Sequence, residues 1–176
     1  PEFAKLDFSK LHLTMSGGTA LTQGAVSIWK QVTGNTITEG YGLSETAPVV
    51  SFNLPGEEEI GTVGKPLQDT EVALLDSYDN PVDEGESGQI AVRGPQVMLG
   101  YWNRDDETAK VMTKDGYFKT GDIGVWVASG ALKIVDRLKD MIIVSGFNVY
   151  PNEVEDVLTA HPDIMEAAVV GKPDEK

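Results

Sequence analysis

The chain has 176 residues and a formal net charge of −14, so it is long enough to bury a core and too acidic for nucleic acid or anionic lipid to be a general partner. It contains no cysteine, which excludes disulfides, zinc–thiolate sites and thiol nucleophiles and is compatible with a cytoplasmic protein. It also has no apolar run of about 18 residues and no basic-then-apolar leader, so we expect no membrane span and no secretion signal.

The first predicted unit is a strand, a tight turn and a helix. Residues 11–16 alternate in polarity, and apolar residues then recur at helical spacing between positions 21 and 29. Another extended segment starts at residue 36, so the order is βαβ and the two strands should be parallel, which predicts an α/β fold. Between strand and helix, Gly17 and Gly18 form either an ordinary turn or a place where a ligand approaches the backbone.

Residues 39–46 read Glu-Gly-Tyr-Gly-Leu-Ser-Glu-Thr and contain the parts of a nucleotide site. The Tyr41 ring can lie on a purine, the Ser44 hydroxyl can bond a phosphate oxygen, and Glu45 can hold Mg²⁺, a cation that takes oxygen ligands. The segment is not a dinucleotide fingerprint, because Glu45 stands where the third glycine belongs. It predicts either a nucleotide site or an ordinary hairpin loop.

From residue 70 the sequence changes to short strands and turns, predicted at 71–75, 89–93, 97–101, 117–118 and 123–127. One short helix should follow Asn103, where three acidic residues complement the helix dipole. The run 95–102 is apolar enough to be core. A compact β subdomain is therefore expected.

Two charged residues in and after this β region are suited to a nucleotide. Asp122 can accept hydrogen bonds from both ribose hydroxyls, although a turn-capping aspartate is an equally good reading. Arg137 follows a predicted strand at 132–135 and offers fixed donors for ribose or phosphate oxygens, or else forms a surface ion pair.

The stretch from residue 136 to 155 is a charged joint followed by a small αβ unit. Residues 141–144 suit an interior strand, Ser145 and Gly146 interrupt it, and a helix is predicted at 151–160. Residues 164–170 predict one more strand.

These motifs together resemble the adenylate-forming acyl-CoA ligase family, above all its bacterial long-chain fatty-acyl members. Residues 41–45 match the family signature aromatic-Gly-x-Thr/Ser-Glu, with Ser44 where threonine is more usual. Residues 117–122 match the motif Tyr-x-Thr-Gly-Asp except for one extra residue, and residues 136–155 are similar to the junction between the large and small domains. The resemblance covers nearly the whole chain.

The resemblance implies a mixed α/β fold in three parts. Residues 1–66 would be the end of the large α/β domain, 67–138 a β-rich, barrel-like subdomain, and 139–176 the hinge and the start of a small α+β domain. The family's phosphate loop and its catalytic lysine fall outside these positions. We therefore expect the chain to be a fragment of an acid–thiol ligase that is inactive by itself.

The resemblance also implies the reaction and the residue roles. A fatty acid would react with ATP to give an acyl adenylate and pyrophosphate, and coenzyme A would then give acyl-CoA and AMP, with Mg²⁺ as cofactor. The catalytic residues would be Ser44 and Glu45, with Glu45 holding the metal. Lys139 would be the hinge, and the residues that bind nucleotide or coenzyme A would be Gly17, Gly18, Thr19, Tyr41, Gly42, Asp122, Arg137 and Gly146.

Two rival readings remain at this point. A related enzyme that loads a carrier protein, or oxidises a luciferin, would share these nucleotide residues. A nucleotide-binding or interaction module without chemistry would also share them. The sequence leaves open the chain length of the acid, the oligomeric state and any peripheral association with a membrane.

Overall fold

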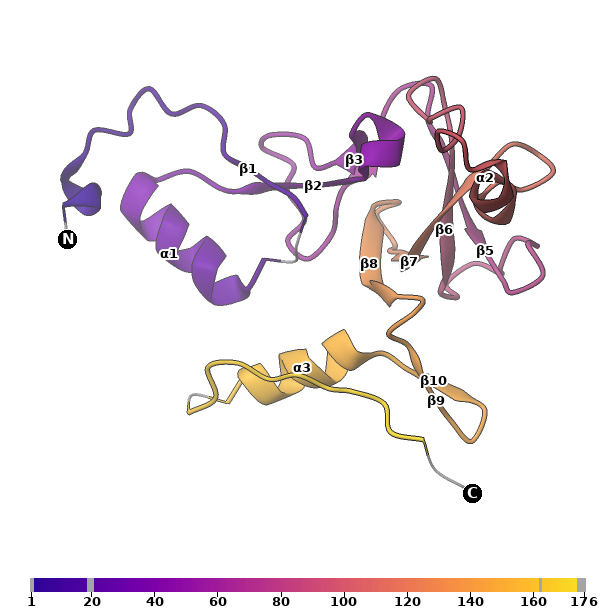
Figure 1. Ribbon diagram of the computed structural model, residues 1–176. Coiled ribbons are helices and arrows are strands. Elements are labelled where there is room, and N and C mark those ends of the chain that lie inside the picture. Colours follow the sequence, from indigo (N-terminus) through magenta and orange to yellow (C-terminus); the bar gives the residue numbers. More distant parts are fainter. Residues whose placement is uncertain (1, 19–20, 162, 174–176) are drawn as a thin grey trace.

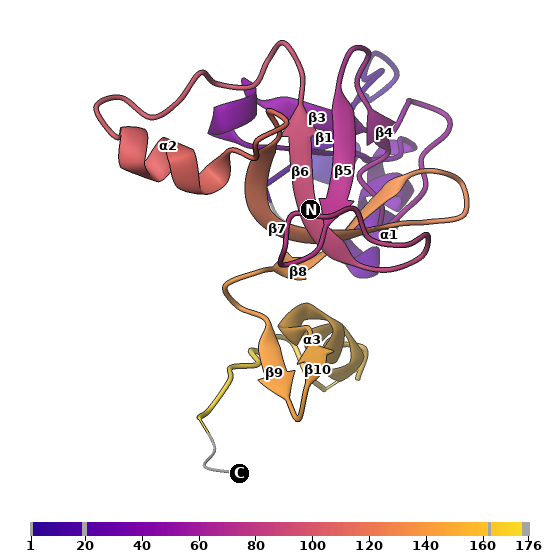
Figure 2. The same ribbon diagram turned by 90° about the vertical axis from the view of Figure 1, so that its right-hand side faces the viewer.

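The computed structural model describes residues 2–18, 21–161 and 163–173, and within these ranges the fold is mixed α/β, as predicted (Figures 1 and 2). The strands form sheets in the orders β1-β2-β3-β4, β5-β6-β7-β8 and β10-β9. The helices are η1 (Phe3–Lys5), α1 (Gln23–Thr33), η2 (Ser44–Thr46), α2 (Asp105–Val111) and α3 (Pro151–Thr159). The strands are β1 (Met15–Ser16), β2 (Thr38–Gly42), β3 (Val49–Phe52), β4 (Lys65–Pro66), β5 (Glu71–Leu75), β6 (Gly88–Arg93), β7 (Phe118–Trp126), β8 (Leu132–Arg137), β9 (Ile142–Val144) and β10 (Phe147–Val149).

The predicted βαβ unit is present in the first sheet. Strand β1 pairs in parallel with β2, and α1 connects them. The helix begins after Thr22, whose Oγ1 accepts a hydrogen bond from the Ala25 amide at 3.3 Å, and it ends at Gly34 in the left-handed conformation. The strand predicted at 11–16 is only two residues long, because the alternating Leu13 and Met15 side chains are exposed and mark no buried face.

The second sheet contains the core. Strands β5 to β8 pair antiparallel in sequence order. Ile90, Val92 and Leu132 are fully buried in a cluster with Leu74 and with Val50 of β3, so this core also joins the first sheet to the second. The segments predicted as two strands at 117–118 and 123–127 are one strand, β7, whose register shifts against both neighbours.

The expectation of a barrel-like subdomain is wrong. The residues that the structure describes form an open sheet, in which β5 and β8 are the two outer strands. Instead of pairing with β5, the start of β8 is bonded to the segment before β4. The Val63 amide donates to the Leu132 carbonyl, and the Leu132 amide donates to the Gly64 carbonyl, each at 2.8 Å. These bonds occupy the edge that closure would need.

The apolar run at 95–102 forms no strand and belongs to the core only in part: Val97 packs against the buried cluster, but Leu99 and Trp102 do not, which corrects two expectations. All of its residues are described, and its backbone bonds go to a loop and a helix rather than to a sheet: the Met98 amide donates to the Glu45 carbonyl and the Tyr101 amide to Thr108 Oγ1. Leu99 and Trp102 are 102% and 90% exposed.

The last part of the chain is a hairpin, β9–β10, followed by α3, which lies below the second sheet and is connected to it through one segment (Figures 1 and 2). The predicted helix at 151–160 is confirmed, but β9 is not an interior strand, because Ile143 and Val144 are exposed. Residues 164–170 are all described and form no strand. The division of the chain into domains stays a prediction.

None of the helices in the described ranges is long and apolar enough to cross a membrane.

Candidate functional site

Three predicted nucleotide residues, which come from three strands, lie together in the structure. The Tyr41 hydroxyl of β2 donates to Asp122 Oδ2 of β7 at 2.6 Å, across 81 positions of sequence. Asp122 is the register partner of Arg137 in β8, and Arg137 Nε lies 3.7 Å from Asp122 Oδ1. The fold therefore brings a phenol, a carboxylate and a guanidinium to one place on the second sheet.

Asp122 is held firmly while Arg137 is free to reach a ligand. The Asp122 side chain is 13% exposed and that of Arg137 is 63% exposed. The Asp122 amide donates to Thr120 Oγ1 at 3.1 Å, and Thr120 Oγ1 donates in turn to the Ile90 carbonyl at 2.9 Å. Asp122 thus lies within a strand and its carboxylate bonds a distant tyrosine, which is not the geometry of a turn cap.

Tyr41 is protonated at neutral pH and acts as a donor. Its ring packs against the apolar cluster that contains Val50. Burial raises the pKa of the Tyr41 phenol far above its ordinary value, and the negative charge of Asp122 raises this pKa further. The hydrogen bond uses one of about four acceptor positions on the Asp122 carboxylate, so most of them remain for a ligand such as the two ribose hydroxyls.

The predicted catalytic loop is a short 3-10 helix, η2, which is fixed by a buried threonine. Thr46 is fully buried, and its hydroxyl lies 3.0 Å from the Leu43 carbonyl and 2.8 Å from the Pro48 carbonyl. Ser44 is exposed and Glu45 is half-buried. The loop therefore presents a hydroxyl and a carboxylate side by side, at the end of the strand that carries Tyr41.

Glu45 has a partner that the sequence analysis did not identify. The Tyr101 hydroxyl donates to Glu45 Oε1 at 2.9 Å. Burial raises the pKa of the Tyr101 phenol, and this hydrogen bond raises it further. We predicted the run around Tyr101 to be core. The one feature of this run that pointed to another role was the hydroxyl of Tyr101, a polar group within an apolar stretch.

Three of the predicted glycines lie near β2 or in the turn before α1, and each has a different structural setting. A Cβ at Gly17 would lie 3.3 Å from the Gly40 carbonyl oxygen, so Gly17 borders the strand, β2, that carries Tyr41. A Cβ at Gly42 would lie 1.7 Å from the Pro48 carbonyl oxygen, so backbone packing already requires a glycine there. Gly18 has a positive φ of 91° between β1 and α1. Thr19 lies outside the described residues.

Gly146 and Lys139 lie outside this cluster. Gly146 is the second residue of the two-residue turn that joins β9 to β10, where Ser145 and Gly146 have φ of 50° and 88°. Positive φ at both positions is the requirement of the tight hairpin turn, which explains this glycine by itself. Lys139 is exposed, in the turn between β8 and β9.

The site contains one carboxylate suited to a metal. Among the described residues, no group of three or more histidine, cysteine, aspartate or glutamate side chains could hold a metal ion. Magnesium in phosphate-transfer sites is often held by one or two carboxylates together with the phosphates of the substrate. The half-buried Glu45 fits a metal that arrives with a nucleotide, and the described residues offer no all-protein cage.

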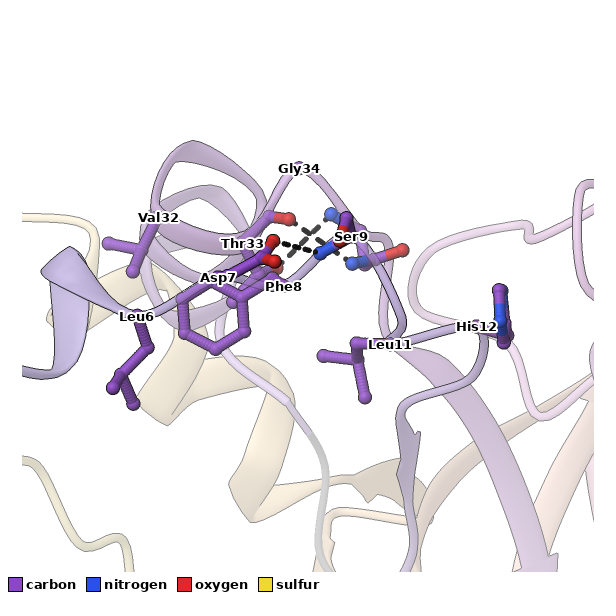
Figure 3. A pocket seen from close by; sticks show the side chains of 10 residues that line it. Leu6, Asp7, Phe8, Ser9, Leu11, His12, Val32, Thr33 and Gly34 are labelled. Carbon is purple, nitrogen blue, oxygen red and sulfur yellow. Dashed lines mark hydrogen bonds between the residues drawn. The ribbon is translucent and has the colours of Figure 1, made fainter.

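Two cavities among the described residues do not coincide with the cluster. One, of about 610 Å³, lies between the segment around Phe8 and the end of α1 near Thr33, and its polar groups bond one another (Figure 3). The other, of about 530 Å³, is lined by Lys139, β9 and α3. Tyr41, Asp122 and Arg137 line neither cavity.

The chain matches two family models. Residues 1–102 match the model described as AMP-binding enzyme, and residues 153–176 match the AMP-binding enzyme C-terminal domain. The first match covers more than half of the sequence. The chain belongs to the AMP-binding enzyme family.

Curated relatives have a common name. The chain is 51% identical over 174 residues to a long-chain-fatty-acid–CoA ligase of Salmonella typhimurium, and 42% identical over 176 residues to the ligase of that name from Bacillus subtilis. These matches cover 98% and 99% of the chain but 31% of each relative. The chain therefore spans about a third of the length of the curated relatives it matches.

Solved structures of similar fold include an amide bond synthetase and an anthranilate CoA ligase. The amide bond synthetase McbA from Marinactinospora thermotolerans has a TM-score of 0.90 and 36% identity, over 99% of this chain and 36% of its own. The anthranilate CoA ligase AuaEII, solved in complex with anthranoyl-AMP, has a TM-score of 0.87 and 33% identity, over 99% of this chain and 34% of its own.

Proposed function

We propose that this chain is the nucleotide-binding part of an ATP-dependent long-chain fatty-acid–CoA ligase. The observation that carries the proposal is the convergence of Tyr41, Asp122 and Arg137 from three strands, with Ser44 and Glu45 at the end of one of them. Together they offer groups suited to a base, a ribose and phosphates. Membership of the AMP-binding enzyme family supports the same ligand.

The proposed chemistry proceeds in two steps. A carboxylate oxygen of the fatty acid attacks the α-phosphorus of ATP, and the bond to the bridging oxygen breaks as pyrophosphate leaves. The sulfur of coenzyme A then attacks the acyl carbonyl carbon of the adenylate, and AMP leaves as the thiol proton passes to a base. Neither step needs a protein nucleophile, so positioning and charge stabilisation by the site supply the catalysis.

Each residue of the cluster has a role in this scheme that its geometry supports. Asp122, fixed by Tyr41 and by the bond of its amide to Thr120, accepts the ribose hydroxyls. The exposed Arg137 donates to ribose or phosphate oxygens, a task for which a guanidinium has fixed donors. The Tyr41 ring contacts the adenine, while its hydroxyl orients Asp122.

The loop at η2 faces the phosphates in this proposal. Ser44 offers an exposed hydroxyl to a phosphate oxygen, and Glu45 would hold Mg²⁺. When bound, the metal neutralises phosphate charge and favours departure of pyrophosphate. Gly17 and Gly18, together with Thr19, would border the acyl and adenine pockets, and Gly42 would keep the backbone of the loop close to the nucleotide.

The residues beyond β8 belong to the second half-reaction in this proposal. Lys139, in the connection between β8 and β9, would be the hinge for movement of the C-terminal segment, and Gly146 would line the path of the pantetheine arm of coenzyme A. The exposure of Lys139 in a turn suits a hinge, because hinge residues absorb changes in backbone angles.

Identity with the relatives favours a long-chain fatty acid over other acids. The chain is 51% identical to a relative named for that substrate, and 33% to 36% identical to the anthranilate ligase and the amide bond synthetase. The nucleotide residues alone do not separate these substrates, because all of the proposed contacts are to ATP rather than to the acid.

Activity against a panel of acids tests this function. A protein of the relatives' full length that contains this sequence is incubated with ATP, Mg²⁺, coenzyme A and one acid at a time, and AMP and thioester are measured. We expect thioester with long-chain fatty acids and little with anthranilate or short acids. Transfer of the acyl group to a carrier protein instead would favour the first rival reading. ATP binding without formation of adenylate from any acid would favour a module without chemistry.

A further inference from the structure

We propose that Tyr101 is a positioning residue for Glu45: its hydroxyl holds the Glu45 carboxylate in the orientation that meets the magnesium–phosphate group. The inference rests on the proposed function. It concerns a residue outside the nucleotide motifs, in a run that the sequence presented as core.

The loop that carries Tyr101 contacts Glu45 at both its side chain and its backbone. The Tyr101 hydroxyl donates to Glu45 Oε1 at 2.9 Å, and the Met98 amide donates to the Glu45 carbonyl at 2.8 Å. These contacts span about fifty positions of sequence and place residues 98–101 against η2. Two hydrogen bonds to one residue restrain both the position of its backbone and the rotation of its carboxylate.

Polar contacts fix the part of this loop that carries Tyr101, while Val97 before it packs against the core cluster. Leu99 and Trp102, the large apolar residues on either side, are exposed to solvent. The Tyr101 amide instead donates to Thr108 Oγ1 of α2 at 2.9 Å, and Thr108 Oγ1 donates to the Arg104 carbonyl at 3.0 Å. A Cβ at Gly100 would lie 3.0 Å from the Thr108 side chain, so the loop passes close to the helix. Helix α2 thus fixes the backbone from which the Tyr101 ring reaches Glu45.

This geometry leaves one carboxylate oxygen available. Tyr101 bonds Oε1, and within the part of the chain that the structure describes Oε2 has no protein partner. A hydrogen bond to one oxygen of a carboxylate fixes the direction of the other, which is what a ligand to a metal requires.

The chain contains a matched control. Tyr117 is also half-buried, and its hydroxyl donates to Glu71 Oε2 at 3.0 Å, so it makes the same phenol–carboxylate bond. Glu71 pairs with Arg93 on the surface of the second sheet and has no part in the proposed site. Tyr117→Phe therefore removes an equivalent hydroxyl whose carboxylate partner lies outside the proposed site.

The test is a double-substitution cycle in a protein of the relatives' full length. Tyr101→Phe, Glu45→Gln, the double variant and Tyr117→Phe are compared in two measurements: the affinity for ATP by calorimetry as Mg²⁺ is varied, and exchange of pyrophosphate with ATP in the presence of a fatty acid. We expect Tyr101→Phe to raise the Mg²⁺ concentration needed for half-maximal effect about fivefold and to slow exchange about tenfold. Tyr117→Phe should change both by less than about twofold.

The cycle separates positioning from general support. If Tyr101 acts through Glu45, Tyr101→Phe adds little further loss in the Glu45→Gln background. Equal losses in both backgrounds, or an unchanged Mg²⁺ dependence of Tyr101→Phe, would overturn the inference. Failure of the proposed function looks different: the unsubstituted protein would exchange no pyrophosphate with any acid, while Mg²⁺-dependent ATP affinity still reports whether Tyr101 orients Glu45.

Discussion

The sheet β5–β8 and the C-terminal group of β9, β10 and α3 are stabilised in different ways. The sheet has a core of fully buried side chains, among them Ile90 and Leu132. The C-terminal group exposes large apolar residues such as Phe147 and Val157, and in the described part of α3 only Pro151 is buried. The ribose-binding candidates lie on the first region and the proposed hinge leads to the second. In the proposed function, the first region would hold the nucleotide while the second, which has few buried side chains, would move about the hinge between the two steps.

Hydrogen bonds join the two regions. Asp136 of β8, which is buried, accepts from the Arg137 amide at 2.7 Å and from the Asn152 amide at the start of α3 at 3.0 Å. The Ser87 and Tyr150 hydroxyls lie 2.7 Å apart. A carboxylate at the N-terminus of a helix is favoured by the helix dipole, so Asp136 anchors α3 at one point.

The largest effect is expected on the free energy of unfolding, when one apolar side chain is shortened in each of the two regions. Ile90→Ala should lower the free energy of unfolding by about 3 kcal/mol, because it leaves a cavity in a filled core. Val157→Ala shortens a side chain that is 75% exposed, so it should change the free energy of unfolding by less than about 0.5 kcal/mol. Urea denaturation measures both. Similar losses for the two variants would contradict the contrast between the regions.

A second prediction concerns the proposed role of the first region. In a protein of full length, Asp122→Ala should lower kcat/KM for ATP about hundredfold, since hydrogen bonds to a charged group are lost in the transition state. Glu71→Ala, which removes an exposed carboxylate from the same sheet, serves as the control and should leave kcat/KM within about twofold. Unchanged kinetics for Asp122→Ala would falsify its assignment to the ribose.

The joint between the regions can be tested at Lys139. Proline locks φ and restricts the residue before it, so Lys139→Pro should confine the turn that the Asp140 amide closes on the Arg137 carbonyl, at 3.1 Å, to one conformation. We expect it to slow thioester formation about tenfold or more while pyrophosphate exchange continues, because one pose of the C-terminal segment becomes inaccessible.

Lys139→Ala separates the backbone from the side chain in this test. It keeps φ free, so it should slow thioester formation much less than proline does. If both variants lose both half-reactions equally, Lys139 is not a hinge.

A smaller effect is expected at the anchor of α3. Asp136→Asn removes the charge at the helix N-terminus and should speed amide hydrogen exchange in α3 about fivefold, with exchange in β6 and β7 unchanged. Asp156→Asn, an exposed change within α3, is the matched control. Faster exchange in the second sheet as well would show that the two regions unfold together.

The smallest effect is a pH dependence of the chain's stability. The folded-state pKa of Tyr41 is raised, so the stability linked to it is complete below the unfolded value of about 10 and declines as the pH rises above that value. Tyr41→Phe should therefore lose less stability between neutral and alkaline pH than the unsubstituted chain. Denaturation midpoints at the two pH values measure this. An identical alkaline loss would exclude Tyr41 as its source.

The local sequence pattern was sufficient to predict some helices and strands, namely those whose residues already favour that structure without contacts from elsewhere in the chain. The helix at 151–160 follows from a proline at its start and apolar spacing, and the strand at 71–75 from its β-branched and aliphatic residues. The same reasoning failed at 95–102 and 164–170. At 95–102 apolar composition predicted a strand and core, and at 164–170 it predicted a strand. Whether such a segment pairs and is buried depends on what lies opposite it in the fold, which the local sequence does not specify.

Chemistry and motifs visible in the sequence were enough to select the segment around Tyr41, Asp122 and Arg137 as candidates for a nucleotide site. The hydrogen bonds from Tyr41 to Asp122 and from Tyr101 to Glu45 became visible only in the folded chain. The physical reason is distance along the chain. A hydrogen bond between residues far apart in sequence depends on strand register and on where a loop is anchored, and these follow from the packing of the whole sheet rather than from any short stretch.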